Sequence, residues 1–289
     1  MAVRLPIYMD HHATTPVAAE VFEAMRPYFL EHFGNAASRN HVFGQAAEAA
    51  VEKARAEVAH LIGCRPMEIV FTSGATEADN LALKGIAQAY RDRGTHLITS
   101  QIEHHAILDV CKRLEKDGFQ VTYLPVDRTG MVDPAAVAKA ITPKTILVSI
   151  MLANNEVGTI QPLAEIGKIC KAWGVLLHSD AVQGIGKIPV HVDELGVDAL
   201  SLTAHKMYGP KGVGALYVRM GAPRVRLIPQ MDGGGHEKGR RSGTLNVPGI
   251  VGLGKGCALS GRVMAEEMAR LAGLRERLRA ELCLRLDHI

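Results

Sequence analysis

The sequence predicts an α/β fold in which helices flank a mainly parallel β-sheet. Short runs rich in Val, Ile, Leu and Thr alternate along the chain with longer segments of helical character. The short runs are apolar almost throughout, as strands buried on both faces of a sheet are. Since no internal repeat or low-complexity linker interrupts this alternation, we expect most of the chain to form one α/β unit.

Seven of the short runs are candidate strands. Each has the length and the β-branched content of a buried strand, and each is followed by polar or glycine-containing residues. In chain order they lie at residues 68–72, 96–100, 121–126, 145–151, 175–180, 199–204 and 214–219.

Helix boundaries are visible at several places between these strands. Residues 43–63 are rich in alanine and charged on one side, and Gly63 is a natural helix stop. Asp133-Pro134 predicts a capping residue followed by proline in the first helical turn. Thr15-Pro16 predicts the same arrangement for the segment that follows it.

The last predicted helix covers residues 262–286 and carries an apolar stripe. Its large apolar side chains recur at steps of three and four, which is the spacing of one helix face. The stripe consists of Met264, Met268, Leu271, Leu274, Leu278 and Leu282. We expect this face to need a partner surface and, left bare, to favour association.

Composition argues against several classes of function. The 289 residues include 33 basic and 30 acidic side chains, so a net charge of +3 gives no electrostatic case for nucleic acid or a membrane surface. The first ten residues lack the apolar core of a signal peptide, and no apolar run reaches the roughly 18 residues of a membrane span. Five scattered cysteines without a CxxC pair favour the reducing cytoplasm, and each is expected to be a buried structural thiol: Cys64, Cys111, Cys170, Cys257 and Cys283.

Polar clusters follow five of the predicted strands. In an open α/β sheet, ligands bind outside the carboxyl ends of the strands. The clusters are SGATEADN, QIEHHA, LANNEVG, AVQG and HKMYGPKG. Because the carboxyl ends of parallel strands meet at one edge, we expect a shared site there.

Two of these clusters suit a charged ligand. Residues 73–76 open a helix, whose free N–H groups would bind an anion, although the same residues could be an ordinary helix cap. Asp180 ends an apolar strand, so its carboxylate requires a cationic partner, such as a protonated ring nitrogen, or a structural hydrogen bond. Gln183 follows Asp180 by three residues and could share its site.

Histidine and lysine side chains supply the candidate catalytic groups. His104 and His105 lack the HExxH or CxxC spacing of a zinc site, so we expect no metal and favour an imidazole that moves protons. Lys206 does not follow the phosphate-loop pattern GxxxxGK[ST] and is therefore a candidate imine-forming lysine. Lys211, between proline and glycine, is expected to be a solvated loop charge.

Together these motifs resemble the cysteine desulfurases of the NifS/IscS type, which are pyridoxal-phosphate enzymes of the class V aminotransferase family. The matching stretches cover about the first 255 residues: DHHATTP, FGNAASRNH, FTSGATEADN, EHHAI, NNEVG, HSDAVQ, LTAHKMYGPKGVGALYVR and GGGHEKGRRSGTLN. The resemblance implies a fold-type I large domain at residues 15–257. Residues 1–14 and 258–289 would belong to an incomplete small domain.

The resemblance also implies roles around the cofactor ring. Lys206 would hold pyridoxal phosphate as an internal aldimine and shuttle the α-proton of the substrate. Asp180 would pair with the pyridinium nitrogen, and Gln183 would bond the phenolic oxygen. His104 would stack on the ring as acid or base, and Asn155 would orient the substrate carboxylate.

A second group of residues would bind the cofactor phosphate. Ala75 and Thr76 would do so through the helix start, and Thr203 and His205 through their side chains. Thr244 would reach the phosphate of a partner subunit, which implies a homodimer.

The implied reaction removes sulfur from L-cysteine, giving L-alanine and an enzyme persulfide for an Fe–S scaffold or another sulfur acceptor. The chain ends at Ile289, before the positions where this family carries its nucleophilic cysteine and a substrate-binding arginine. We therefore expect a shortened chain that binds the cofactor but transfers sulfur poorly or not at all. The alternatives are a selenocysteine lyase or another class V enzyme, and a non-catalytic scaffold that keeps the fold.

Overall fold

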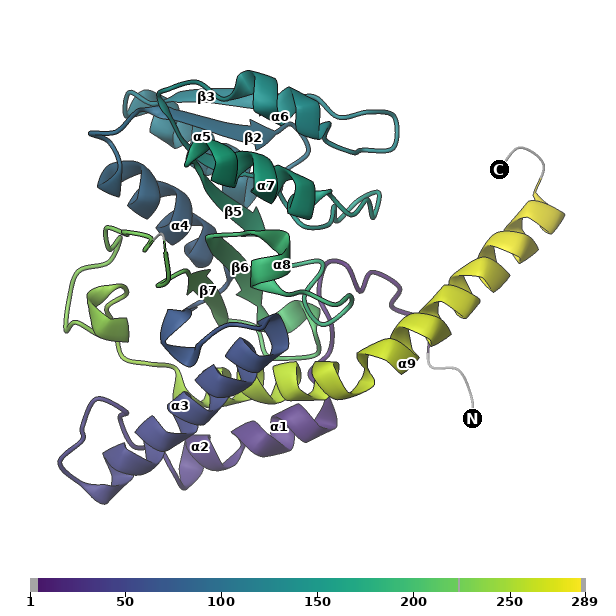
Figure 1. Cartoon of the computed structure of the whole chain (residues 1–289). Coiled ribbons are helices and arrows are strands. Elements are labelled where there is room, and N and C mark those ends of the chain that lie inside the picture. Colours follow the sequence, from purple (N-terminus) through teal and green to yellow (C-terminus); the bar gives the residue numbers. More distant parts are fainter. Residues whose placement is uncertain (1–4, 223, 287–289) are drawn as a thin grey trace.

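One seven-stranded sheet forms the centre of the computed structural model, which describes residues 5–222 and 224–286 (Figure 1). Each strand overlaps one of the seven predicted runs. The strands are β1 (Ile69–Thr72), β2 (His96–Ser100), β3 (Gln120–Leu124), β4 (Thr145–Ser149), β5 (Leu176–Asp180), β6 (Ala199–Thr203) and β7 (Gly214–Val218).

The sheet is mainly parallel, as predicted. Its strand order is β1-β7-β6-β5-β4-β2-β3, and only β7 runs antiparallel to its neighbours β1 and β6. A loop of ten residues, 204–213, separates β6 from β7, which is too short for a helical crossover and therefore reverses the chain. The carboxyl ends of the other six strands consequently share one edge of the sheet.

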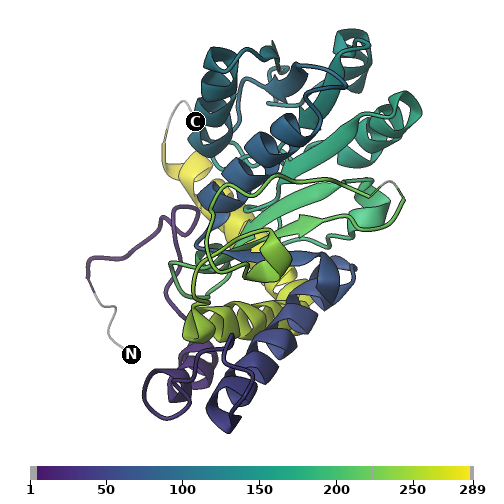
Figure 2. The same cartoon turned by 90° about the vertical axis from the view of Figure 1, so that its left-hand side faces the viewer.

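Helices cover both faces of this sheet (Figures 1 and 2). They are α1 (Ala19–Met25), α2 (Pro27–Leu30), α3 (Val42–Ile62), α4 (Ala75–Ala89), α5 (His105–Lys116), α6 (Pro134–Ala140), α7 (Leu163–Trp173), α8 (Val192–Leu195) and α9 (Val247–Arg285). Side chains of α4 and α5 form one apolar core with Val70, whereas those of α3, α6, α7 and early α9 form the other with Ile69 and Phe71. Alternate residues of β1 therefore face opposite layers, as the pleat of a strand requires.

Two of the predicted helix boundaries are confirmed. Gly63 ends α3 in the left-handed conformation with φ of 69°, which glycine adopts without steric cost. Asp133 caps α6, because its carboxylate accepts a 2.8 Å hydrogen bond from the backbone N–H of Ala135.

The prediction for Thr15-Pro16 is wrong. The first helix begins at Ala19, and no described side chain caps it. Instead, the Thr15 hydroxyl donates to the carbonyl oxygen of His205 and accepts from the N–H of Tyr208, both at 2.9 Å. This residue therefore fastens the N-terminal segment to the loop that carries Lys206.

Helix α9 starts earlier than the predicted tail and runs unbroken for 39 residues. Its first half packs beside α3 and α1, and its second half extends away from the sheet (Figures 1 and 2). The helix passes without a break through residues 257 and 258, so the proposed domain boundary stays a prediction. Within the described ranges, no helix combines the length and apolar character that a bilayer crossing needs.

The cysteines are not all buried. Cys111, Cys170 and Cys257 are buried as expected, and Cys64 is partly buried. Cys283 lies on the exposed second half of α9, so the prediction of a buried thiol is wrong there. Leu278 and Leu282, its neighbours on the predicted stripe, are also open to solvent.

Candidate active site

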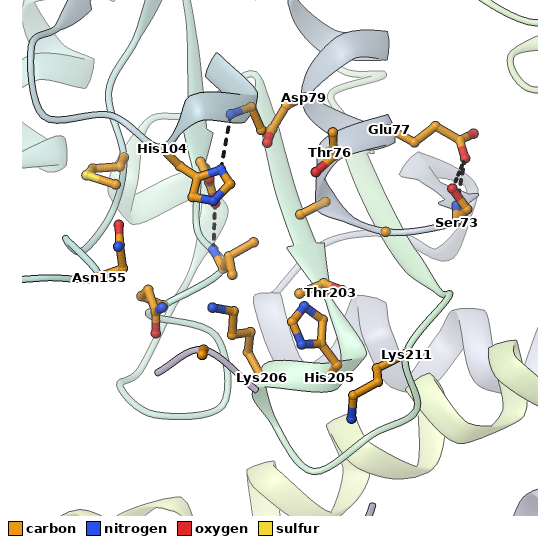
Figure 3. Close-up of a pocket in the computed structure, with 18 of the residues that line it drawn as sticks. Ser73, Thr76, Glu77, Asp79, His104, Asn155, Thr203, His205, Lys206 and Lys211 are labelled. Carbon is orange, nitrogen blue, oxygen red and sulfur yellow. Dashed lines mark hydrogen bonds between the residues drawn. The ribbon is translucent and has the colours of Figure 1, made fainter. Parts of the chain in front are cut away.

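A cavity of about 410 Å³ opens at the carboxyl edge of the sheet (Figure 3). Nine of the ten predicted site residues line it: Ala75, Thr76, His104, Asn155, Asp180, Gln183, Thr203, His205 and Lys206. They reach the cavity from the segments that follow β1, β2, β4, β5 and β6. Thr244 is exposed on the loop before α9 and lies outside the described cavity wall, so its predicted contact with a partner subunit is untested.

Lys206 stands at the end of a short 3₁₀ turn directly after β6. Its ammonium group donates a hydrogen bond to the carbonyl oxygen of His12. Burial lowers the pKa of Lys206, while the nearby carboxylates of Asp180 and Asp10 act in the opposite direction. A lysine with a lowered pKa is more often a neutral amine, which is the form that attacks a carbonyl carbon.

Asp180 is buried at the last position of β5. Among the described residues, only the backbone N–H of Val182 donates to its carboxylate, at 3.0 Å. Burial raises the pKa of Asp180, opposed by that N–H and by the charges of His104 and Lys206. A carboxylate in this position would gain strongly from a cation placed in the cavity.

His104 caps the start of α5 through its ring. Its Nδ1 accepts a 3.1 Å hydrogen bond from the backbone N–H of Ala106, so the neutral ring carries its proton on Nε2. The ring lies over the cavity between α4 and the Lys206 loop (Figure 3). This arrangement fixes the ring in place and leaves the Nε2–H group to donate a hydrogen bond to a ligand.

The start of α4 is an open anion-binding end. No described side chain caps its first turn, and a Cβ placed at Gly74 would meet no atom within 4 Å. The acid in this turn, Glu77, is held by Arg241 at 2.7 Å and by the backbone N–H of Ser73 at 2.8 Å. The N–H groups of the turn therefore face free space, and Arg241 balances the negative charge of Glu77. Both features favour an anionic ligand at this end of the helix.

Near this end, one hydroxyl group and one imidazole ring already have protein partners. The Thr203 hydroxyl donates to the carbonyl oxygen of Val213 at 3.2 Å, and it keeps lone pairs and free rotation. Nδ1 of His205 lies 3.1 Å from the hydroxyl of Thr14. Lys211, expected to be a solvated charge, is exposed but also lies at the cavity wall.

Two amide side chains also line the cavity. Gln183 donates through Nε2 to the carbonyl oxygen of His12 at 3.0 Å, and its Oε1 accepts from Lys187 at 2.6 Å. Asn155 donates to the Glu156 carboxylate at 2.8 Å.

Sequence reasoning missed Asp79, which also lines the cavity. This residue is fully buried, and neither of its carboxylate oxygens has a hydrogen-bond partner among the described residues. Burial and the neighbouring Asp180 raise its pKa. Its position three residues after Thr76, on the same helix face, is the signal that could have found it.

His178 lies below this group and gives it no counter-charge. Its Nε2 is 3.7 Å from a carboxylate oxygen of Asp79, but burial lowers the pKa of the imidazole to about 3, so the ring is neutral. Its two nitrogens contact the hydroxyls of Ser149 and Ser201 at 2.9 and 3.0 Å. Burial and the neighbouring Asp180 therefore disfavour a charge on Asp79, and the neutral His178 ring does not offset this.

The described part of the cavity wall contains no cluster of metal ligands and no thiol. No group of three or more His, Cys, Asp or Glu side chains in the described part of the chain is arranged to hold a metal ion. The five cysteines likewise lie outside the cavity wall that the described residues form.

Comparison with known proteins shows which families and structures this chain resembles. Residues 7–289 match the model of the "Aminotransferase class-V" family. The "Cysteine desulfurase IscS" of Anaeromyxobacter sp. (strain Fw109-5) is 60% identical over 285 residues, which are 99% of this chain and 70% of that protein. The protein of the same name from Klebsiella pneumoniae (strain 342) is 53% identical over 96% of this chain and 69% of its own length.

Two solved structures resemble the chain closely. A "NIFS-LIKE PROTEIN" has a TM-score of 0.92 and 45% identity, covering 96% of this chain and 75% of its own. "SspA in complex with cysteine" has a TM-score of 0.83 and 45% identity, covering 87% of this chain and 72% of its own. The chain thus spans about 70% of the length of the relatives that it matches.

Proposed function

Because the chain belongs to the class V aminotransferase family, we propose that its cavity is the cofactor and substrate site of a cysteine desulfurase that depends on pyridoxal phosphate. The observation that carries this proposal is the convergence of Lys206, Asp180, His104 and the open start of α4 on one cavity. The high identity to cysteine desulfurases over nearly the whole chain supports the same conclusion.

The residues present fit pyridoxal phosphate. The open first turn of α4 suits a phosphate, and a buried carboxylate with one backbone donor, Asp180, suits a protonated ring nitrogen. Lys206 lines the same cavity and has a lowered pKa, as a lysine that binds an aldehyde should. Thr203, His205 and Gln183 stand around the same space as further polar contacts.

Each side chain contributes a defined step to the chemistry. When bound, pyridoxal phosphate withdraws electrons from the bonds around the α-carbon of an amino acid. The neutral amine of Lys206 can take the α-proton and return it, and the Nε2–H group of His104 can donate a hydrogen bond to the substrate. Asp180 would pair with the ring nitrogen of the bound cofactor, and Asn155 would offer its amide to a substrate carboxylate.

L-cysteine is the proposed substrate and L-alanine the proposed amino-acid product. The names of the desulfurase relatives and the cysteine complex of a structural neighbour support this choice over selenocysteine. We further propose a homodimer, in which Thr244 reaches the partner's phosphate site, and sulfur delivery to an Fe–S scaffold or another acceptor protein. A cytoplasmic setting agrees with the absence of disulfide bonds among the five cysteines.

Borohydride trapping tests the central assignment. The purified chain, mixed with pyridoxal phosphate, should develop a visible absorbance band that borohydride removes, and peptide mapping should find the reduced adduct on Lys206. Lys206→Ala should abolish both signals, whereas Lys211→Ala should keep them. An adduct on Lys211 would refute the lysine assignment, and no absorbance band at all would favour a non-catalytic scaffold.

A further inference from the structure

A lysine outside the predicted site is hydrogen-bonded to one of its members. Lys187 lies four residues after Gln183, and its Nζ donates a 2.6 Å hydrogen bond to the side-chain oxygen of Gln183. The lysine is only partly exposed and lines a second cavity of about 360 Å³ between the N-terminal segment and α9. Lys206 lines both cavities, so it shares the second cavity with Lys187.

This contact decides which end of the Gln183 amide faces the main cavity. A glutamine side chain has one acceptor oxygen and an NH₂ group with two donors. Lys187 donates a hydrogen bond to the oxygen, and one N–H of Gln183 donates to the carbonyl oxygen of His12. The group left for a ligand is the second N–H, which selects an acceptor such as an anionic oxygen.

The same carbonyl oxygen connects both lysines. The carbonyl of His12 accepts from Gln183 and also from Lys206. Lys187, Gln183, His12 and Lys206 therefore form one continuous chain of hydrogen bonds. A change at Lys187 would reach Lys206 through these three hydrogen bonds.

The chain also brings two like charges close together. Burial and the charge of Lys206 lower the pKa of Lys187 to about 8. Because such coupling is reciprocal, a charged Lys187 favours the neutral amine of Lys206 to the same extent. The other titratable groups around the second cavity are Asp10, His11, His12, Tyr208 and Glu267. The carboxylate of Asp10 raises the pKa of Lys206 and so acts against the effect of a charged Lys187.

We propose that Lys187 is a positioning residue of the cofactor site, which holds the Gln183 amide with its N–H toward the ligand and disfavours a proton on Lys206. The proposal deepens the function proposed above and rests on it for the identity of the ligand. The oxygen that this N–H would meet is the phenolic oxygen of the cofactor ring, which the donor keeps in its anionic form.

Lys187→Met tests this role, because it removes the charge and the donor but keeps most of the side-chain volume. In the cofactor-free protein, the pH dependence of Lys206 acylation, read by peptide mass spectrometry, should show a pKa about one unit higher than in the wild type. With cofactor, the pH midpoint of its visible absorbance should also rise by about one unit, and its affinity should fall about tenfold. Lys187→Arg should keep the acylation pKa, the absorbance midpoint and the affinity close to those of the wild type. Lys171→Met, at an exposed lysine of α7, should leave all three unchanged.

The two measurements separate this proposal from the proposed function. If the chain does not bind pyridoxal phosphate, the Lys206 acylation profile still reports on Lys187. If Lys187→Met changes neither the acylation profile nor the absorbance midpoint, the positioning role is wrong even though the cofactor binds. Should Lys187→Met fail to fold, Gln183→Glu keeps a partner for Lys187 but replaces the N–H with an acceptor, and an unchanged midpoint in that variant would overturn the proposal.

Discussion

At the scale of single residues, Glu103, the buried acid that precedes His104 in the chain, has a raised pKa. Glu103 is fully buried; its Oε1 accepts from the Ser100 hydroxyl at 2.6 Å and from the Met151 N–H at 3.0 Å. Burial raises the pKa of Glu103 to about 8, which those hydrogen bonds offset only in part. The folded protein therefore keeps a proton on Glu103 at pH 7, which the unfolded chain, with a carboxyl pKa near 4.5, does not.

Glu103→Gln should make the protein more stable at neutral pH. Between pH 4.5 and pH 8 the folded wild type binds one proton more at this residue than the unfolded chain, so its free energy of unfolding falls as pH rises, by about 1.4 kcal/mol per unit at most. A neutral glutamine has the shape of the protonated acid and removes this slope. Urea unfolding at pH 5 and pH 8 should show an advantage of the variant that is larger at pH 8.

The exposed Glu266 provides a matched control for this prediction. Glu266→Gln should leave the pH dependence of stability as it is in the wild type. An advantage of Glu103→Gln that is equal at both pH values would contradict the protonated state of Glu103.

The sequence could predict which polar residues lie at the ends of the strands, but not the hydrogen bonds of the side chains around them. Lys206 and Asp180 were predictable because each directly follows a buried strand, and parallel strands bring their carboxyl ends together. The unpaired oxygens of Asp79 and the role of Lys187 were not predictable, because the first is defined by donors that are missing and the second by a contact with Gln183. Both properties depend on distances that a sequence pattern does not contain.

At the scale of secondary structure elements, the approach of α9 to α3 depends on one glycine. A Cβ added to Gly254 would lie 2.6 Å from the Cα and 2.7 Å from the Cβ of Ala54. Backbone atoms of a packed helix cannot give way as the end of a long side chain can. The two helices could keep this crossing only by moving apart.

Gly254→Val should therefore destabilise the protein by about 1–3 kcal/mol, the usual cost of overpacking a core. Gly273→Ala on the exposed part of the same helix is the control, since a Cβ there meets no atom within 4 Å. It should stabilise the helix by up to about 1 kcal/mol. Denaturant unfolding checks both values, and equal effects of the two changes would show that helix propensity, and not helix contact, sets the result.

Local signals predicted some element boundaries and failed where a residue has a distant partner. Gly63 and Asp133 act within their own helices, so their positions could be read from neighbouring residues. Thr15 has the same chemistry as a helix cap, but its hydroxyl is bonded to the loop after β6, 190 residues further along the chain. Nothing near Thr15 in sequence signals that partner.

At the scale of the whole molecule, the second half of α9 presents its predicted stripe to solvent. Leu271, Leu274 and Leu278 are 50%, 50% and 51% exposed. Apolar side chains aligned in this way on one helix are a contact surface for another chain.

A change to the stripe should reduce self-association of the 289-residue chain. Leu271→Gln combined with Leu278→Gln lowers the apolar area and keeps good helix formers, so the larger species should become less abundant in light scattering behind size exclusion. Arg275→Gln combined with Arg279→Gln changes other exposed positions of the same helix and should have little effect. Equal association in the wild type and the leucine variant would show that the stripe makes no such contact.

Sulfur transfer requires a thiolate at the substrate, and the described residues bring none to the cavity wall. Burial raises the pKa of Cys64, Cys111 and Cys170 to about 12 and also raises that of Cys257, so these thiols remain protonated at neutral pH. We therefore expect the 289-residue chain to bind pyridoxal phosphate and to shift its absorbance with L-cysteine, but to form little alanine or sulfide. Alanine and sulfide assays on the cofactor-loaded chain, with a reducing agent present, measure this directly. Rapid sulfide release that one Cys→Ala change abolishes would show that a cysteine of this chain reaches the cavity after all, and the exposed Cys283 would be the first to replace.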